Sequence, residues 1–246
     1  MQRQMTKWYY QAVLASCALV VYVSANDDKN EALKPLPRET LKAWRGIGAN
    51  VGWMKMELGD NRPTFQVEGQ TKGIMVFQFN EWKEGVLAKM PDPGAPFGLG
   101  LNLTKMTDEG LKELVGLKSL QALYLAGTQV TDAGLKDLAG RKSLLTLDVR
   151  WTKVTVAGLK ELAGLTTLQR LYLNHCGVTD AGVKELTGLK SLQILNISAS
   201  EVTDAGLKEV ANLKSLQSLI MWGTKATPAG IAELRKELPK CRIDDQ

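Results

Sequence analysis

Hydrophobic residues in the second half of the chain recur with a fixed spacing of 24 residues. A period of about 20 to 29 residues is typical of a solenoid, in which each unit buries its apolar side chains only by stacking on its neighbours. The repeated residues are therefore predicted to be structural, and any specific function is expected where the copies differ. The copies begin at Met106, Val130, Val154, Val178, Val202 and Ala226.

Each copy contains the pattern L-x-x-L-x-L-x-x-(T/C/S), as at residues 120–128. Within that copy Leu123 and Leu125 flank Tyr124, and such alternation predicts a short strand. The two leucines are expected to face a core, while Tyr124 and its equivalents in other copies are expected to face solvent.

The helical part of each copy has its own start and stop signals. Thr131 is placed to cap a short helix, and the helix dipole favours a carboxylate at Asp132 in its first turn. In the last copy Thr227 is the expected cap and Pro228 replaces Asp132, which fits because proline is well tolerated at the first helical position. Left-handed C-caps are predicted where glycine or asparagine recurs at the other end: Gly116, Gly140, Gly164, Gly188 and Asn212.

These repeats resemble the leucine-rich repeat family, in particular the bacterial "TDAGL" type with 24-residue repeats, which is similar to cysteine-containing leucine-rich repeats. The resemblance covers about residues 97–246. It implies an α/β fold, a right-handed solenoid with a curved parallel sheet on its concave face and short helices on its convex face. It also implies protein binding, without naming a partner.

The small residue that ends the pattern is interpreted as architecture, because its side chain can hydrogen-bond the backbone of the turn. It occurs as Thr104, Thr128, Thr152, Cys176, Ser200 and Thr224. Two positions depart from the repeat. Arg141 replaces a recurrent leucine and is expected to extend its charged end to solvent, and Val156 replaces the aspartate, which is expected to weaken one helix cap.

The first 25 residues have the layout of a secretory signal peptide, with a basic start, an apolar run over 12–23 and small residues before Asn26. An uncleaved membrane anchor is one alternative. A bacterial lipoprotein signal with Cys17 as the lipidated residue is another. All three would export the protein, to the periplasm, the cell envelope or the extracellular space.

The region before the repeats is predicted to be irregular. A helix is expected near Glu39–Ala49, followed by strand-like runs at 51–58 and 64–67. Counting back 24 residues from Leu99 reaches Met75, which predicts a degenerate repeat there. The chain is thus divided into 1–25 signal peptide or anchor, 26–73 linker and N-terminal cap, 74–96 degenerate repeat, 97–234 leucine-rich repeats, and 235–246 C-terminal cap.

Composition and charge favour a globular domain that does not bind nucleic acid. Hydrophobic residues make up 44% of the 246 residues, and the formal net charge is +5. Removal of a leader with Arg3 and Lys7 would leave +3, which is too small to indicate a nucleic-acid partner. Basic and acidic residues alternate along the helical segments, as on a solvated surface. A membrane would be contacted only through an uncleaved N-terminal segment.

Residues that could carry catalysis or bind a metal are few. His175 is the single histidine, and the sequence has no CxxC pair, no GxSxG elbow and no GxxxxGK(S/T) phosphate loop. Asp148, His175 and Ser198 fall on successive predicted strands, but no oxyanion hole or pocket accompanies them. We therefore expect no enzyme activity, no cofactor and no metal. Cys176 and Cys241 are about two repeats apart, at roughly 4.8 Å per repeat, so two free thiols are expected.

The variable, solvent-facing strand positions are the candidate site. Aromatic and arginine residues gather there in neighbouring copies, and these types dominate binding hot spots. The predicted partner-binding residues are Tyr124, Asp148, Arg150, Trp151, Arg170, Tyr172, Asn174, His175 and Trp222. The sequence thus predicts an exported, non-catalytic module that binds a protein or peptide on its concave face. Two alternatives stay open: the aromatic side chains only cover exposed sheet, or the chain is a structural or self-associating cell-envelope protein.

Overall fold

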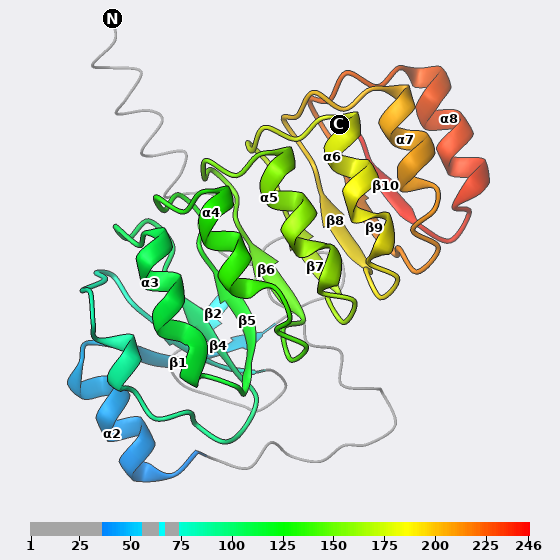
Figure 1. The fold of residues 1–246 in the computed structure, drawn as a ribbon. Helices are drawn as coiled ribbons and strands as arrows, with labels where there is room; N and C mark the ends of the chain where they lie inside the picture. Colours follow the sequence, from blue (N-terminus) through cyan, green and yellow to red (C-terminus); the bar gives the residue numbers. More distant parts are fainter. Residues whose placement is uncertain (1–35, 56–63, 67–73) are drawn as a thin grey trace, which may run out of the picture.

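The computed structural model describes residues 36–55, 64–66 and 74–246. The predicted signal, anchor or lipoprotein segment with Cys17 lies outside the described residues, as do the linker up to residue 35 and the ends of the strand-like runs, at 56–58 and 67. The described part is a stack of repeats with a sheet along one side and helices along the other (Figure 1). An α/β repeat fold with short helices is therefore confirmed.

One ten-stranded sheet runs the length of the stack, in the order β10-β9-β8-β7-β6-β5-β4-β3-β1-β2. Strands β3 to β10 are parallel, whereas β1 pairs antiparallel with both β2 and β3. The strands are β1 (Asn50–Lys55), β2 (Thr64–Gln66), β3 (Met75–Gln78), β4 (Phe97–Gly100), β5 (Leu120–Tyr124), β6 (Thr146–Asp148), β7 (Arg170–Tyr172), β8 (Ile194–Asn196), β9 (Ser218–Ile220) and β10 (Arg242–Asp244).

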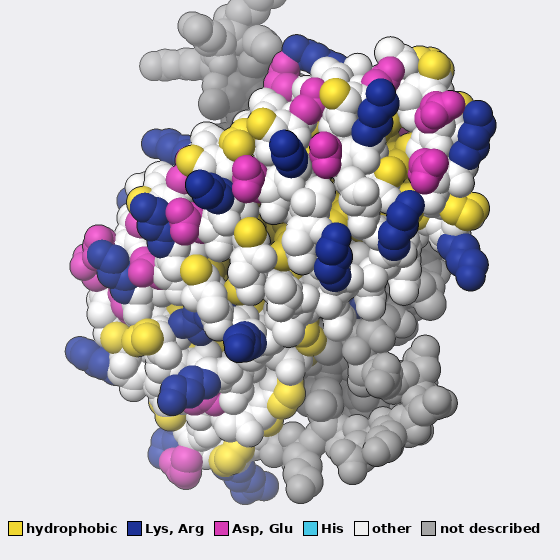
Figure 2. Space-filling model, turned by 45° about the vertical axis from the view of Figure 1, so that its right-hand side comes forward, with side chains coloured by type: hydrophobic (Ala, Val, Ile, Leu, Met, Phe, Trp, Pro, Cys, Tyr) yellow, Lys and Arg dark blue, Asp and Glu magenta, His cyan; other side chains and the backbone are white. Residues whose placement is uncertain are grey.

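Helices connect successive strands on the opposite side. They are α2 (Arg38–Gly46), α3 (Asp108–Lys112), α4 (Asp132–Leu135), α5 (Val156–Glu161), α6 (Asp180–Glu185), α7 (Asp204–Val210) and α8 (Pro228–Glu237). Short 3₁₀ helices are η1 (Leu87–Lys89), η2 (Glu113–Gly116), η3 (Lys136–Leu138), η4 (Leu162–Gly164) and η5 (Leu186–Gly188). Basic and acidic side chains are interspersed over the face that Figure 2 shows.

Leucines of successive strands form the core. Leu123 pairs with Leu147, and Leu147 with Leu171, and all three side chains are fully buried between sheet and helices. The first repeat is closed by α2, which overlaps the predicted helical segment and begins one residue before it. Trp44 of α2 is buried, stacks on Phe77 with ring centroids 4.3 Å apart, and donates its Nε1–H to the Pro91 carbonyl at 3.2 Å.

The degenerate repeat joins the parallel ladder in a register other than the predicted one. Strand β3 pairs with β4 so that Phe77 lies opposite Leu99, whereas the 24-residue count placed Met75 there. The register differs by two residues because the connection after β3 contains only the short helix η1 and lacks the α-helix that the full repeats have.

The prediction of left-handed C-caps is correct for Gly140 alone, whose φ is +83°. Gly116, Gly164, Gly188 and Asn212 do not have positive φ. Each of these four residues stands in a turn that the next leucine closes: the N–H of Leu165, for example, donates to the Leu162 carbonyl at 2.9 Å.

The repeated threonine and aspartate link neighbouring repeats. Thr131 caps α4 as predicted, accepting a hydrogen bond from the N–H of Ala133. Its own N–H and hydroxyl donate to the carboxylate of Asp108 in the preceding repeat, at 2.8 and 2.7 Å. The recurrent glycine two residues into the helix is needed because a Cβ at Gly134 would collide with that carboxylate. The sequence analysis missed this contact between repeats.

Arg141 joins its repeat to the preceding one. Arg141 is half-buried, and its Nη1 donates to the Leu117 carbonyl of the preceding repeat at 3.2 Å. Burial lowers the pKa of its guanidinium.

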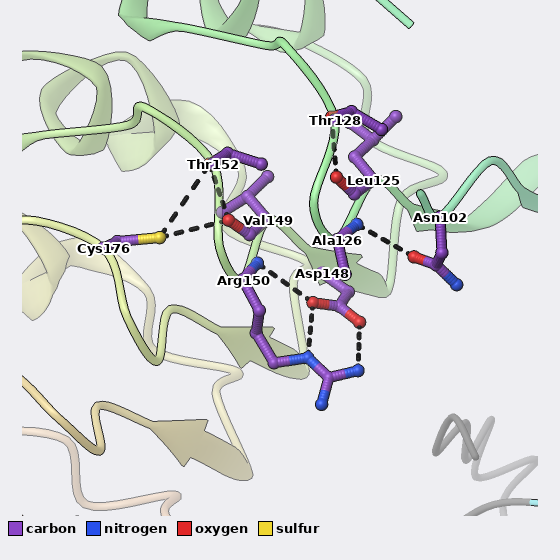
Figure 3. A network of polar contacts seen from close by, with 9 residues as sticks. All are labelled: Asn102, Leu125, Ala126, Thr128, Asp148, Val149, Arg150, Thr152 and Cys176. Atoms are coloured by element: carbon purple, nitrogen blue, oxygen red, sulfur yellow. Dashed lines mark hydrogen bonds and ion pairs between the residues drawn. The ribbon is translucent and has the colours of Figure 1, made fainter. Parts of the chain in front are cut away.

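The small residues that end the repeat pattern bond the backbone of their own turn. The hydroxyl of Thr128 donates to the Leu125 carbonyl at 2.6 Å, and Thr152 repeats this contact with Val149 (Figure 3). The architectural interpretation of the small residues is confirmed at these positions.

Candidate binding surface

Most of the predicted binding residues on the strands are buried. Tyr124 is fully buried, Arg170 is 1% exposed and Tyr172 is 4% exposed. Asp148 and Asn174 are also buried. Strand alternation does direct these side chains away from the leucines, but the expectation that they face solvent is wrong. Alternation fixes the direction of a side chain, not whether other atoms cover it.

An ion pair between neighbouring positions accounts for part of this burial. Asp148 accepts hydrogen bonds from Arg150 Nε at 2.8 Å, from Nη2 at 2.7 Å and from the Arg150 backbone N–H at 3.1 Å (Figure 3). The guanidinium carbon lies 5.7 Å from the centroid of the Tyr172 ring, a distance suited to a cation–π contact. Arg150 thus pairs with the carboxylate of Asp148 and lies over the ring of Tyr172.

Other polar side chains at these positions also bond backbone at the strand ends. Asn102 Oδ1 accepts from the N–H of Ala126 at 2.8 Å (Figure 3), and Asn196 Oδ1 accepts from the N–H of Ser198 at 3.0 Å. These variable residues therefore have a structural use that the sequence did not reveal.

Burial raises the pKa of the Tyr172 hydroxyl to about 12 and that of Tyr124 well above its usual value, so both remain protonated.

A second row of variable residues lies at the turn after each strand. In this turn the N–H of Thr128 donates to the Leu125 carbonyl at 3.1 Å, and the residue before Thr128 has positive φ. Such a turn normally takes glycine at that position. The equivalent residues, all with positive φ, are Leu103, Gly127, Trp151, His175, Ala199 and Gly223.

Trp151 and His175 hold this left-handed conformation, each with φ of 58°. A residue other than glycine costs of the order of 1–3 kcal/mol there. The sheet hydrogen bonds continue through the turn and fix the backbone: Trp151 N–H donates to the Asn174 carbonyl at 3.3 Å, and His175 N–H donates to the Ser198 carbonyl at 3.2 Å.

The side chains at this turn form an aromatic rim, defined here as Trp151, His175 and Trp222. The rings of Trp151 and His175 stack with centroids 3.4 Å apart and an interplanar angle of 16°. Trp222 meets His175 edge-on at 6.0 Å, across the repeat that carries the small Ala199. Trp222 is 41% exposed, and Trp151 and His175 are half-buried.

The rim therefore brings together three of the predicted site residues, with half-buried Arg150 beside them. Leu103, 42% exposed at the first of these turns, was missed by the sequence analysis. The available signal was its place directly before Thr104, the small residue that ends the pattern.

The arrangement does not form the Asp-His-Ser triad considered from the sequence. Both carboxylate oxygens of Asp148 are bonded by Arg150, and the His175 ring is stacked on Trp151. Burial and the charge of Arg150 lower the pKa of His175, so its ring is neutral at pH 7.

Cys176 is not placed as a reactive nucleophile. Its thiol donates to the Val149 carbonyl at 3.1 Å (Figure 3), and burial raises its pKa to about 11. Cys176 and Cys241 are both free thiols.

Within residues 36–55, 64–66 and 74–246, histidine, cysteine, aspartate and glutamate do not gather into a group that could hold a metal ion. None of the helices described is both long and apolar enough to span a bilayer.

Comparisons with known proteins agree with the repeat fold. A family model described as "Leucine Rich repeat" matches residues 116–139, 142–163, 164–186 and 188–211. A comparison with curated protein sequences gave no match. An internalin C2 from Listeria monocytogenes has a similar structure, with a TM-score of 0.54 and 29% identity, over 68% of this chain and 69% of that one. A leucine-rich repeat protein from Leptospira interrogans gives a TM-score of 0.52 and 27% identity, over 68% of this chain and 40% of that one. Together these matches support a leucine-rich repeat family for this chain.

Proposed function

We propose that this chain is an exported, non-catalytic module that binds a protein or peptide through its concave sheet face and the aromatic rim. Its repeats are of the 24-residue "TDAGL" type in a right-handed solenoid, and residues 1–25 direct export. The repeat family supports protein binding in general. The basis for export is the layout of the N-terminal sequence.

The observation that carries the proposal is the presence of Trp151 and His175 at turn positions that favour glycine. Two left-handed residues cost about 1–3 kcal/mol each. An aromatic pair contributes only about 0.5–1.5 kcal/mol beyond its buried area. The stack and the buried area of the rings are of the same order as this strain, whereas Gly127 and Gly223 form the same turn without any strain. We take partner recognition as the reason why aromatic rings stand at positions that glycine would fill at no cost.

The predicted site residues take two roles in this proposal. The rim residues and Arg150 are accessible enough to touch a partner, with exposed Trp222 as the main anchor. Behind them lies a supporting layer that fixes the position of Arg150. It consists of Tyr124, Asp148, Arg170, Tyr172 and Asn174, all buried.

Affinity capture from a cell-envelope extract tests the proposal. The baits are the wild-type protein, a double variant Trp222→Ala with His175→Ala, and the control Val115→Ala, which alters a side chain that is 77% exposed in η2 on the helical side. A partner retained by wild type and control but lost by the double variant supports the proposal. Equal retention by all three baits contradicts it.

Sedimentation separates partner binding from the self-associating alternative. A wild-type protein that stays monomeric at high concentration favours the binding module. Concentration-dependent oligomers that persist in the double variant favour self-association through other surfaces.

A further inference from the structure

Arg150, which directly precedes Trp151 in the chain, is already paired: its guanidinium makes a two-pronged contact with the carboxylate of Asp148. Asn174 and Ser198 follow Arg150 at the equivalent position in the next two repeats. Such a surface offers hydrogen bonds without selecting a charged ligand.

Asn174 and Ser198 are buried polar residues whose side-chain oxygens could accept further hydrogen bonds. Asn174 is 5% exposed and Ser198 is fully buried, and Asn174 Oδ1 and Ser198 Oγ make no hydrogen bond to the part of the chain that the structure describes. Buried polar atoms are normally paired, so each such atom needs an explanation. Both lie directly before a rim-turn position, at His175 and Ala199.

The backbone N–H groups at the rim, unlike these side chains, are already paired. The N–H of His175 donates to the Ser198 carbonyl, and the N–H of Ala199 donates to the Trp222 carbonyl at 2.9 Å. A ligand at the rim therefore cannot pair with these N–H groups, as an extended peptide does when it binds along the edge of a sheet. It must instead use aromatic faces and side-chain amide or hydroxyl groups.

We propose that the rim around His175 and Trp222 binds a neutral, linear oligosaccharide. A sugar ring presents an apolar C–H face to an aromatic ring and hydroxyl groups at its edge. Trp222, which is 41% exposed and packs beside His175, supplies the aromatic face, and Asn174 Oδ1 and Ser198 Oγ accept hydroxyl hydrogens when the side chains that cover them move aside. This site goes beyond the proposed function and does not depend on it.

Titration of the full chain with chitohexaose and with cellohexaose tests the inference, by calorimetry and by tryptophan fluorescence. At least one of the two sugars should bind the wild type. Trp222→Ala should weaken that binding at least tenfold, Trp222→Phe should retain most of it, and Val115→Ala should leave it unchanged. Thermal melts show whether each variant is folded.

The inference is overturned if neither sugar binds the wild type, or if folded Trp222→Ala binds the sugar as tightly as the wild type does. If neither sugar binds but the rim variant loses a captured protein partner, the rim is a protein site and only the oligosaccharide inference is wrong. If a sugar binds and no protein partner depends on the rim, the proposed protein-binding function is wrong and this inference stands.

Discussion

Asp132 joins two repeats by accepting hydrogen bonds from the backbone N–H and the hydroxyl of Thr155, at 2.7 and 2.6 Å. The same contact recurs between Asp108 and Thr131, Asp180 and Thr203, and Asp204 and Thr227. It is interrupted where Val156 replaces the aspartate, and the hydroxyl of Thr179 there makes no capping bond. The turns that directly precede Val156 and Thr179 are joined by the stack of Trp151 on His175.

Restoring the missing carboxylate should stabilise the fold. Val156→Asp should raise the free energy of unfolding by about 1–2 kcal/mol, because hydrogen bonds to a charged acceptor are stronger than neutral ones. Chemical denaturation measures the change. The matched control is Val156→Asp combined with Thr179→Val, which lacks the donor hydroxyl. A gain of the same size in that control, measured against Thr179→Val alone, would show that the hydroxyl of Thr179 does not contribute to it.

Acid should weaken these links. Hydrogen bonds from Thr227, backbone first and hydroxyl second, lower the pKa of Asp204 below its usual value. A carboxylate with a lowered pKa in the folded state contributes stability above its unfolded pKa, near 4, and loses that contribution as the pH falls through the folded value. Asp204→Asn should therefore reduce the melting temperature at pH 7 and have little effect at strongly acidic pH. An equal reduction at both pH values would contradict this origin.

The core should be intolerant of truncation. Leu171 is fully buried among leucines of the neighbouring strands. Leu171→Ala should lower the free energy of unfolding by about 2–5 kcal/mol, since the cavity can collapse only partly. An unchanged denaturation midpoint would mean that Leu171 does not face the shared core.

Relief of left-handed strain should change the stability of the fold by different amounts at two of the turns. Ala199 has φ of 51°, so Ala199→Gly should stabilise the fold by about 1 kcal/mol. Trp151→Gly gains similar relief but loses the stack on His175, so its stability should stay within about 1 kcal/mol of wild type. Denaturation of both variants checks this. A loss of several kcal/mol in Trp151→Gly would show that the ring is a structural element.

The sequence predicted the repeat architecture because the same residue types recur in phase. Leu123, Leu147 and Leu171 fall on successive strands and must share one core. The sequence could not predict the burial of Tyr124 and Tyr172, because alternation gives only the side to which each ring points. A double change of Tyr172 and Arg150 to alanine, which the sequence alone would expect the fold to tolerate, is therefore expected to destabilise it.

Two other features depend on tertiary geometry. The left-handed backbone of His175 opposes local preference and is held by sheet hydrogen bonds to the next repeat. The contact of Asp132 with Thr155 depends on the close approach of two helices, which Gly158 permits because a Cβ there would collide with the carboxylate. Its sequence signal was the joint recurrence of threonine, aspartate and glycine.

The central claim, that the aromatic rim carries partner recognition, is tested most directly by the affinity of the captured partner for the double variant Trp222→Ala with His175→Ala. Calorimetric titration against wild type, with thermal melts of both proteins, gives the answer. The account predicts a loss of about 2 kcal/mol or more, roughly a 30-fold weaker Kd, in a variant that is still folded. Unchanged affinity in the folded double variant would contradict it.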